Sequence, residues 1–181
     1  MGTRKSIRLK HYDYAQAGCY FVTICAKDKH ELFGRVVKGQ LLLSEFGHVV
    51  KREIETIPQI RNECAIEKFV IMPNHIHLIV RIVGDDGNRP ADDRSSFANH
   101  QADCDSAQRA DCHPPLRRSL SNMVQGFKGA VTRKIGFSLW QRSFHDHIIR
   151  SEADYWRIWQ YIDENPRKWT EDCYFIRESV L

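Results

Sequence analysis

The chain has 181 residues, of which 42% are hydrophobic and 28% are charged, and its formal net charge is +4. These values are typical of one soluble globular domain with a core of its own. No apolar run approaches the roughly 20 residues that a membrane-spanning helix needs. The basic N-terminus lacks the apolar segment of a secretory signal. We therefore expect one domain over residues 1–181, in the cytoplasm, with no membrane partner.

The first third of the chain predicts a strand, a hairpin and a helix. Residues 18–26 are rich in β-branched and aromatic side chains, which favour a buried strand. Residues 32–44 predict two short strands around a turn. Ser44 precedes a helical spacing of apolar residues, and Pro58 is expected to end that helix.

Two further strands and a long polar segment follow. Residues 65–73 and 75–83 predict strands that are joined by a short Pro-Asn turn. Residues 84–115 are polar, acidic and poor in aliphatic side chains, which predicts a mobile insertion without a catalytic role. Four metal-binding side chains in or near this segment, His100, Cys104, Cys112 and His113, match no standard zinc module, so a zinc site there is a minor alternative.

The last part of the chain predicts a helix, a strand and a second helix. Residues 119–136 show a helical stripe of apolar residues with basic residues opposite. Residues 138–150 predict a strand. Ser151 begins a capping box, and the helix that it opens is expected to end at Pro166.

This order of elements indicates the fold class. The two middle strands are joined by a turn too short for a parallel crossover, so the sheet should be antiparallel. We predict an α+β protein with a ferredoxin-like antiparallel sheet, helices packed mainly on one face and a polar insertion at about 84–115.

A pair of histidines lies within the predicted strand at residues 75–83. Side chains alternate along a strand, so His75 and His77 should point to the same face, which they share with Ile79. Two adjacent imidazoles can bind a divalent metal, but His-x-His is short and also occurs on solvated faces. The spacing alone leaves both interpretations open.

Tyr161 and Asn165 lie four residues apart on the last predicted helix and should share one face. Tyr155 should fall on a different face. Periodicity alone favours Tyr161 as a core aromatic, as it does for Trp156 and Trp159.

Three stretches change this balance: "FVIMPNHIHLIV", "FKGAVTRKI" and "LWQRSFHDHIIRSEADYWRIWQYIDENPRKW". Together they resemble the REP-associated tyrosine transposases, a branch of the single-tyrosine HUH nucleases that is related to the transposases of small insertion sequences. The resemblance covers roughly residues 12–169 except for the polar insertion. It implies that His75 and His77 form the HUH motif, that Tyr161 is the nucleophile and that Asn165 is a third metal ligand.

The resemblance also implies a reaction and its partners. A divalent Mg²⁺ or Mn²⁺ would polarise the scissile phosphate of single-stranded or hairpin-forming DNA. Tyr161 would attack and form a 5′-phosphotyrosine, and reversal with another 3′-hydroxyl would transfer the strand. A bacterial, nucleoid-associated protein is implied, with a monomer favoured over a dimer.

Basic and aromatic residues are candidates for contacts with the DNA. The candidate set is Arg4, Lys5, Arg8, Arg117, Arg118, Lys128, Arg133, Lys134 and Trp169. Trp140 and Phe144 alternate along a predicted strand and are expected in the core, and His145 and His147 are expected to be structural. The main rival function is a catalytically silent protein that binds hairpin DNA, and a further rival is a domain with a structural zinc.

Overall fold

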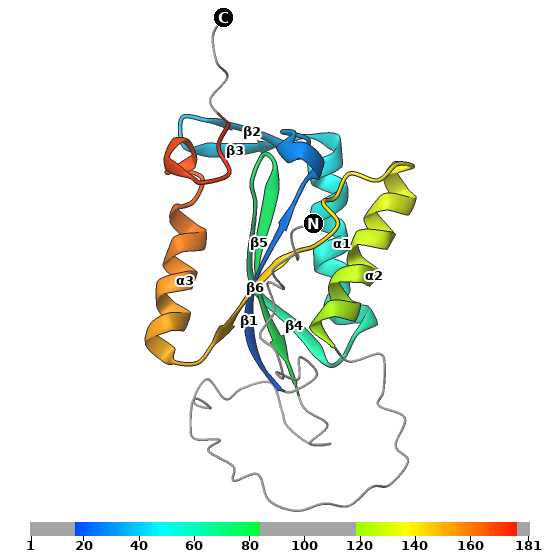
Figure 1. Ribbon diagram of the computed structural model, residues 1–181, viewed down its shortest axis with the longest axis vertical. Coiled ribbons are helices and arrows are strands. Elements are labelled where there is room, and N and C mark those ends of the chain that lie inside the picture. Colours follow the sequence, from blue (N-terminus) through cyan, green and yellow to red (C-terminus); the bar gives the residue numbers. More distant parts are fainter. Residues whose placement is uncertain (1–16, 84–118, 177–181) are drawn as a thin grey trace, which may run out of the picture.

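The computed structural model describes residues 17–83 and 119–176 (Figure 1). An antiparallel four-stranded sheet lies at its centre, with the strand order β4-β5-β1-β6. The elements in chain order are β1 (Gly18–Cys25), the short 3-10 helix η1 (Lys27–Lys29), β2 (Gly34–Val37), β3 (Gln40–Leu43), α1 (Glu45–Ile60), β4 (Cys64–Ile71), β5 (His75–Ile82), α2 (Leu120–Ile135), β6 (His145–Ile149), α3 (Glu152–Glu164) and the 3-10 helix η2 (Trp169–Glu171). The predicted α+β fold and its antiparallel sheet are confirmed.

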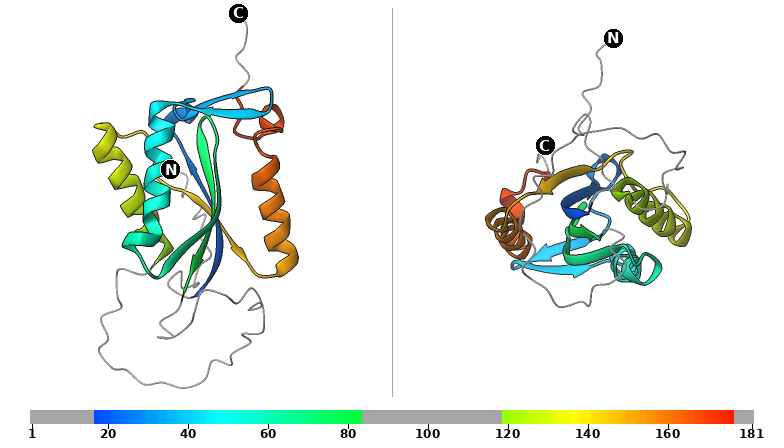
Figure 2. Two further views of the ribbon diagram at one scale, coloured as in Figure 1. Left: turned by 180° about the vertical axis from the view of Figure 1, so that it is seen from behind. Right: turned by 90° about the horizontal axis from the view of Figure 1, so that it is seen from below.

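Helices cover both faces of the sheet, as Figures 1 and 2 show. Helices α1 and α2 pack on one face, where the larger apolar core includes Tyr20, Val22 and Leu78. Helix α3 covers the other face, where a smaller core includes Ile79 and Ile158. Because side chains alternate along β5, the odd-numbered positions that carry His75 and His77 face α3. The fold thus brings the C-terminal helix over the histidine pair.

The helices begin where the sequence predicts. The Ser44, Ser119 and Ser151 side chains each accept a hydrogen bond from the backbone N–H three residues later, which satisfies one of the free donors of the first turn. The prediction that Pro58 ends the first helix is wrong, because α1 continues to Ile60. Proline removes one N–H donor and crowds the carbonyl four residues earlier, but α1 ends only two residues later, so the disturbance is confined to its last turn.

The predicted strand at residues 138–150 is shorter than expected, since only His145–Ile149 forms β6. Trp140 makes an isolated bridge with Ala26. The Nζ atom of Lys128 on α2 donates to the carbonyl oxygens of Gln141 and Ser143, at 2.9 and 2.8 Å. These carbonyls therefore bond a lysine rather than a neighbouring strand, and regular pairing begins only after them.

Gly47 in α1 is predicted to be the least replaceable glycine of the two helices that form the large core. A Cβ atom there would lie 2.0 Å from the Phe33 carbonyl oxygen, which is backbone and has little freedom to move. We expect Gly47→Ala to lower the free energy of unfolding by about 3 kcal/mol or more, as measured by urea denaturation. Gly129→Ala in α2 is the control. Among the described residues its Cβ would meet only the end of the Arg133 side chain, and alanine stabilises a helix by about 1 kcal/mol relative to glycine. Equal losses for both variants would contradict this account.

Within residues 17–83 and 119–176, every helix is too short or too polar to span a bilayer.

Candidate functional site

The two histidines meet at their outer ring nitrogens. The Nε2 atoms of His75 and His77 lie 3.0 Å apart, and both side chains are fully buried on the face of the sheet that α3 covers. The Phe21 ring of β1 stacks on His77, with ring centres 5.1 Å apart. The Tyr174 ring packs against the His75 ring, with ring centres 4.5 Å apart. The strand alternation predicted from the sequence is therefore confirmed, and apolar and aromatic neighbours hold both rings.

Helix α3 places Tyr161 next to this pair. The phenol oxygen of Tyr161 lies 3.2 Å from Nε2 of His77, and its ring meets the Phe21 ring edge-on. The residue is 40% exposed, so the ring is accessible at the edge of the site rather than part of the core. Asn165, the C-cap residue of α3, is buried, and among the described residues its side-chain oxygen has no hydrogen-bond partner. The Tyr161 hydroxyl interacts with the side chains of Asn165 and Asp172, so these three side chains lie close together.

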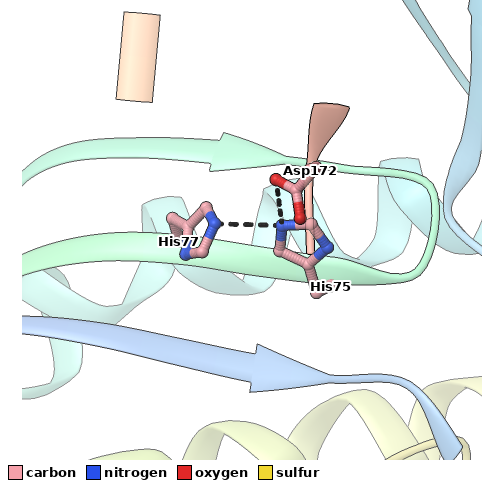
Figure 3. Close-up of side chains that lie close together, drawn as sticks. All are labelled: His75, His77 and Asp172. Atoms are coloured by element: carbon pink, nitrogen blue, oxygen red, sulfur yellow. Dashed lines mark hydrogen bonds and ion pairs between the residues drawn. The ribbon is translucent and has the colours of Figure 1, made fainter. Parts of the chain in front are cut away.

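Asp172 adds a carboxylate that the sequence does not predict. Figure 3 shows this side chain directed at His75, and Oδ2 of Asp172 lies 3.9 Å from the Nε2 atom. One ligand atom each of His75, His77 and Asp172 lies within 4.8 Å of the others, a spacing that could hold a metal ion. Asp172 follows the short helix η2 in an irregular segment, where neither strand nor helix periodicity gives a signal.

The surroundings of the site set the charge of its groups. Burial lowers the pKa of His75 to about 4 although the nearby Asp172 carboxylate opposes this shift, and burial also lowers the pKa of His77. Both imidazoles are therefore neutral near pH 7 and can act as ligands. Burial and then the Asp172 charge raise the pKa of Tyr161 to about 12. Two neutral imidazoles beside a buried carboxylate form a donor set that a cation would complete.

The lowered pKa of His75 predicts a loss of stability in acid. The unfolded chain takes up a proton near pH 6.5 and the folded chain only near pH 4, so the free energy of unfolding should fall as the pH drops between these values. At about pH 5 we expect His75 alone to cost the folded protein about 2 kcal/mol relative to about pH 7.5. Urea denaturation in chelator-treated buffer measures this loss. His75→Gln should show a smaller loss, and an unchanged loss in that variant would contradict the assignment.

The remaining predicted contact residues are scattered. Lys128 is engaged by two carbonyls, and burial lowers its pKa to about 8. Arg133 and Lys134 are both exposed, and Lys134 pairs with Glu53. Trp169 is only 5% exposed and packs against His75, so it supports the site from within. Five further candidates lie outside the described residues: Arg4, Lys5, Arg8, Arg117 and Arg118.

Other expectations have mixed outcomes. Trp140 and Phe144 are in the core, as predicted. The prediction that Trp156 lies in the core is wrong, because that side chain is 55% exposed and donates a hydrogen bond to Glu152. His147 bonds Asp154 on the surface, at 2.7 Å. The four side chains of the zinc alternative, His100, Cys104, Cys112 and His113, lie outside the described residues.

Comparison with known proteins places the chain among relatives. No family model matches it. An uncharacterized protein of Haemophilus influenzae is 36% identical over an alignment of 190 residues, which covers 96% of this chain and 93% of that protein. A "Putative REP-associated tyrosine transposase" of the same organism is 25% identical over 158 residues, or 86% of this chain and 74% of that protein.

A solved structure has a similar fold. It is a REP-associated tyrosine transposase bound to a REP hairpin, with a TM-score of 0.59 and 19% identity, and the match covers 89% of this chain and 73% of that one. The resemblance stated from the sequence is thus confirmed. The chain belongs to one family with its 36% identical Haemophilus relative, and in sequence and fold it is a relative of the REP-associated tyrosine transposases.

Proposed function

We propose that the protein is a metal-dependent endonuclease and strand transferase of single-stranded DNA, with Tyr161 as its nucleophile. One observation carries the proposal. The Tyr161 phenol oxygen lies 3.2 Å from Nε2 of His77, at the point where His77 faces His75. An exposed phenol beside two buried imidazoles is an arrangement that core packing does not require. It is the arrangement that a reaction at a phosphate beside a cation would need.

The side chains at the site fit a divalent cation. His75, His77 and Asp172 would supply two nitrogens and one carboxylate oxygen. The buried oxygen of Asn165, which has no hydrogen-bond partner in the part of the chain that the structure describes, is a further candidate ligand. The oxygen ligands suit Mg²⁺ or Mn²⁺, and the imidazole ligands suit these ions moderately. When bound, such a cation would withdraw charge from the scissile phosphate and favour the phenolate form of Tyr161.

The proposed reaction exchanges one phosphodiester bond for another and therefore needs no ATP. The Tyr161 oxygen loses its proton to solvent and attacks phosphorus. The bond from phosphorus to the 3′ oxygen of the preceding nucleotide breaks, and that oxygen takes up a proton and leaves as a 3′-hydroxyl. The 5′-phosphotyrosine that remains keeps the energy of a phosphodiester. Attack by a different 3′-hydroxyl then releases Tyr161 and joins the strands.

The proposed substrate is hairpin-forming repeat DNA. The similar solved structure is bound to a REP hairpin, which supports this choice for the present chain. Arg133 is a candidate phosphate contact among the described residues because its side chain is exposed. Because Tyr161 and His77 of the same chain meet, a monomer would contain the catalytic groups. We therefore favour a monomer that acts on DNA in the cytoplasm.

Denaturing gel electrophoresis tests the proposal. The full-length protein is incubated with a labelled hairpin oligonucleotide that carries a single-stranded extension, with Mn²⁺ or with a chelator. We expect a covalent protein–DNA adduct only with the metal ion. Hairpin binding in native gels without any adduct would favour the silent binder, and tight zinc binding without an adduct would favour a structural zinc domain.

A further inference from the structure

Each site histidine has a buried hydrogen-bond partner on its second ring nitrogen. Nδ1 of His77 lies 2.8 Å from the Thr23 hydroxyl of β1, and Thr23 is the direct cross-strand neighbour of His77. Nδ1 of His75 lies 2.9 Å from the side-chain oxygen of Asn74. Thr23 and Asn74 are themselves buried. Such partners decide which nitrogen of a neutral imidazole carries the hydrogen.

Asn74 fixes the hydrogen of His75. The Asn74 amide nitrogen donates to the backbone oxygens of Lys29 and Tyr174, at 3.1 and 2.9 Å. These two bonds orient the amide, so its oxygen must face His75 and can only accept. His75 therefore carries its hydrogen on Nδ1, and its Nε2 atom keeps a free lone pair. The same amide ties the C-terminal segment that contains Asp172 to the turn before β5.

Thr23 places no such restriction on His77. Because Nε2 of His75 is an acceptor, the two Nε2 atoms, 3.0 Å apart, form a hydrogen bond only if His77 carries its hydrogen on Nε2, where the Tyr161 oxygen at 3.2 Å can also accept from it. Nδ1 of His77 then accepts from the Thr23 hydroxyl. A hydroxyl can also accept, so the same contact would serve a His77 that carries its hydrogen on Nδ1.

We propose that Thr23 is a positioning residue that lets His77 exchange tautomers when a divalent cation binds. Without a cation, His77 donates from Nε2 to His75 and accepts from Thr23. With a cation, His77 carries its hydrogen on Nδ1 and donates it to Thr23, so that both Nε2 lone pairs face the ion. The imidazole loses one hydrogen and gains one, and it stays neutral. This inference rests on the proposed metal-dependent function.

Two substitutions separate this role from packing. Thr23→Val keeps the shape of the side chain but leaves Nδ1 of His77 without a partner in either tautomer. Thr23→Ser keeps the hydroxyl. We expect Thr23→Val to weaken Mn²⁺ binding in calorimetric titrations by about 10- to 100-fold, whereas Thr23→Ser should stay within about threefold of the wild type. Thermal unfolding without metal checks that both variants fold.

Nitrogen-15 NMR of the imidazole rings observes the exchange itself. In the wild type, addition of Mg²⁺ should move the hydrogen of His77 from Nε2 to Nδ1, while His75 keeps its hydrogen on Nδ1 throughout. A His77 that carries its hydrogen on Nδ1 before Mg²⁺ is added would overturn the inference. Unchanged Mn²⁺ affinity in Thr23→Val, or an equal loss in Thr23→Ser, would overturn it and leave the proposed function intact. If the wild type binds neither ion, the metal-dependent function fails as well.

Discussion

Tyr161→Phe is expected to abolish the covalent protein–DNA adduct, with a fall in its rate of formation of at least about 10³-fold. The substitution removes one oxygen atom, the one that lies 3.2 Å from Nε2 of His77. The ring can keep its edge contact with Phe21, and the side chain is partly exposed, so folding should be little affected. Binding of the hairpin in native gels should change by less than about threefold, because that binding depends mainly on the phosphate backbone.

Two other tyrosines provide matched controls. Tyr155 lies earlier on the same helix, and burial, together with the neighbouring Glu67, raises the pKa of its phenol. Tyr174 packs on His75, but its hydroxyl is directed to Cys25. Tyr155→Phe and Tyr174→Phe should each retain the adduct. An adduct that persists in Tyr161→Phe and disappears in either control would show that the nucleophile is misassigned.

His77→Ala is expected to reduce Mn²⁺ affinity by more than about 100-fold and to remove the adduct. The Nε2 atom of His77 contacts both His75 and Tyr161. Its loss would remove the proposed metal ligand that lies next to the nucleophile. Calorimetric titration with Mn²⁺ measures the affinity, and the gel assay measures the reaction.

The chain offers a second His-x-His pair as a control. His145 and His147 on β6 have the spacing of His75 and His77, but they are exposed, and His147 bonds Asp154. His147→Ala should leave Mn²⁺ affinity and adduct formation unchanged. A Mn²⁺ affinity that depends on His147 rather than on His77 would contradict the proposed metal site.

The sequence predicts the frame of the site because its signals are periodic. Strand alternation places both histidines on one face, and the serine caps give the starts of the helices. The same periodicity misjudges single positions. It assigned Trp156 to the core, yet this side chain lies on the outer surface of α3. Amphipathic spacing predicts a face but not which large side chains the opposing sheet is wide enough to cover.

The approach of Tyr161 to His77 follows from the family resemblance rather than from spacing. Asp172 and Thr23 could not be predicted from the sequence, for a different reason. Asp172 reaches His75 from an irregular segment, so its position depends on tertiary contacts such as the bond from Asn74 to Tyr174. Thr23 left one signal, a hydroxyl within the apolar strand β1, but its partner on β5 becomes visible only with the strand register.

Identification of the residue that becomes linked to DNA tests the central claim most directly. The adduct formed with Mn²⁺ is digested with nuclease and protease, and mass spectrometry locates the remaining nucleotide. We predict a single 5′-phosphate linkage on Tyr161. A linkage on Tyr155, Tyr174 or any other side chain would contradict the proposed mechanism, as would cleavage of the oligonucleotide without any protein-linked product.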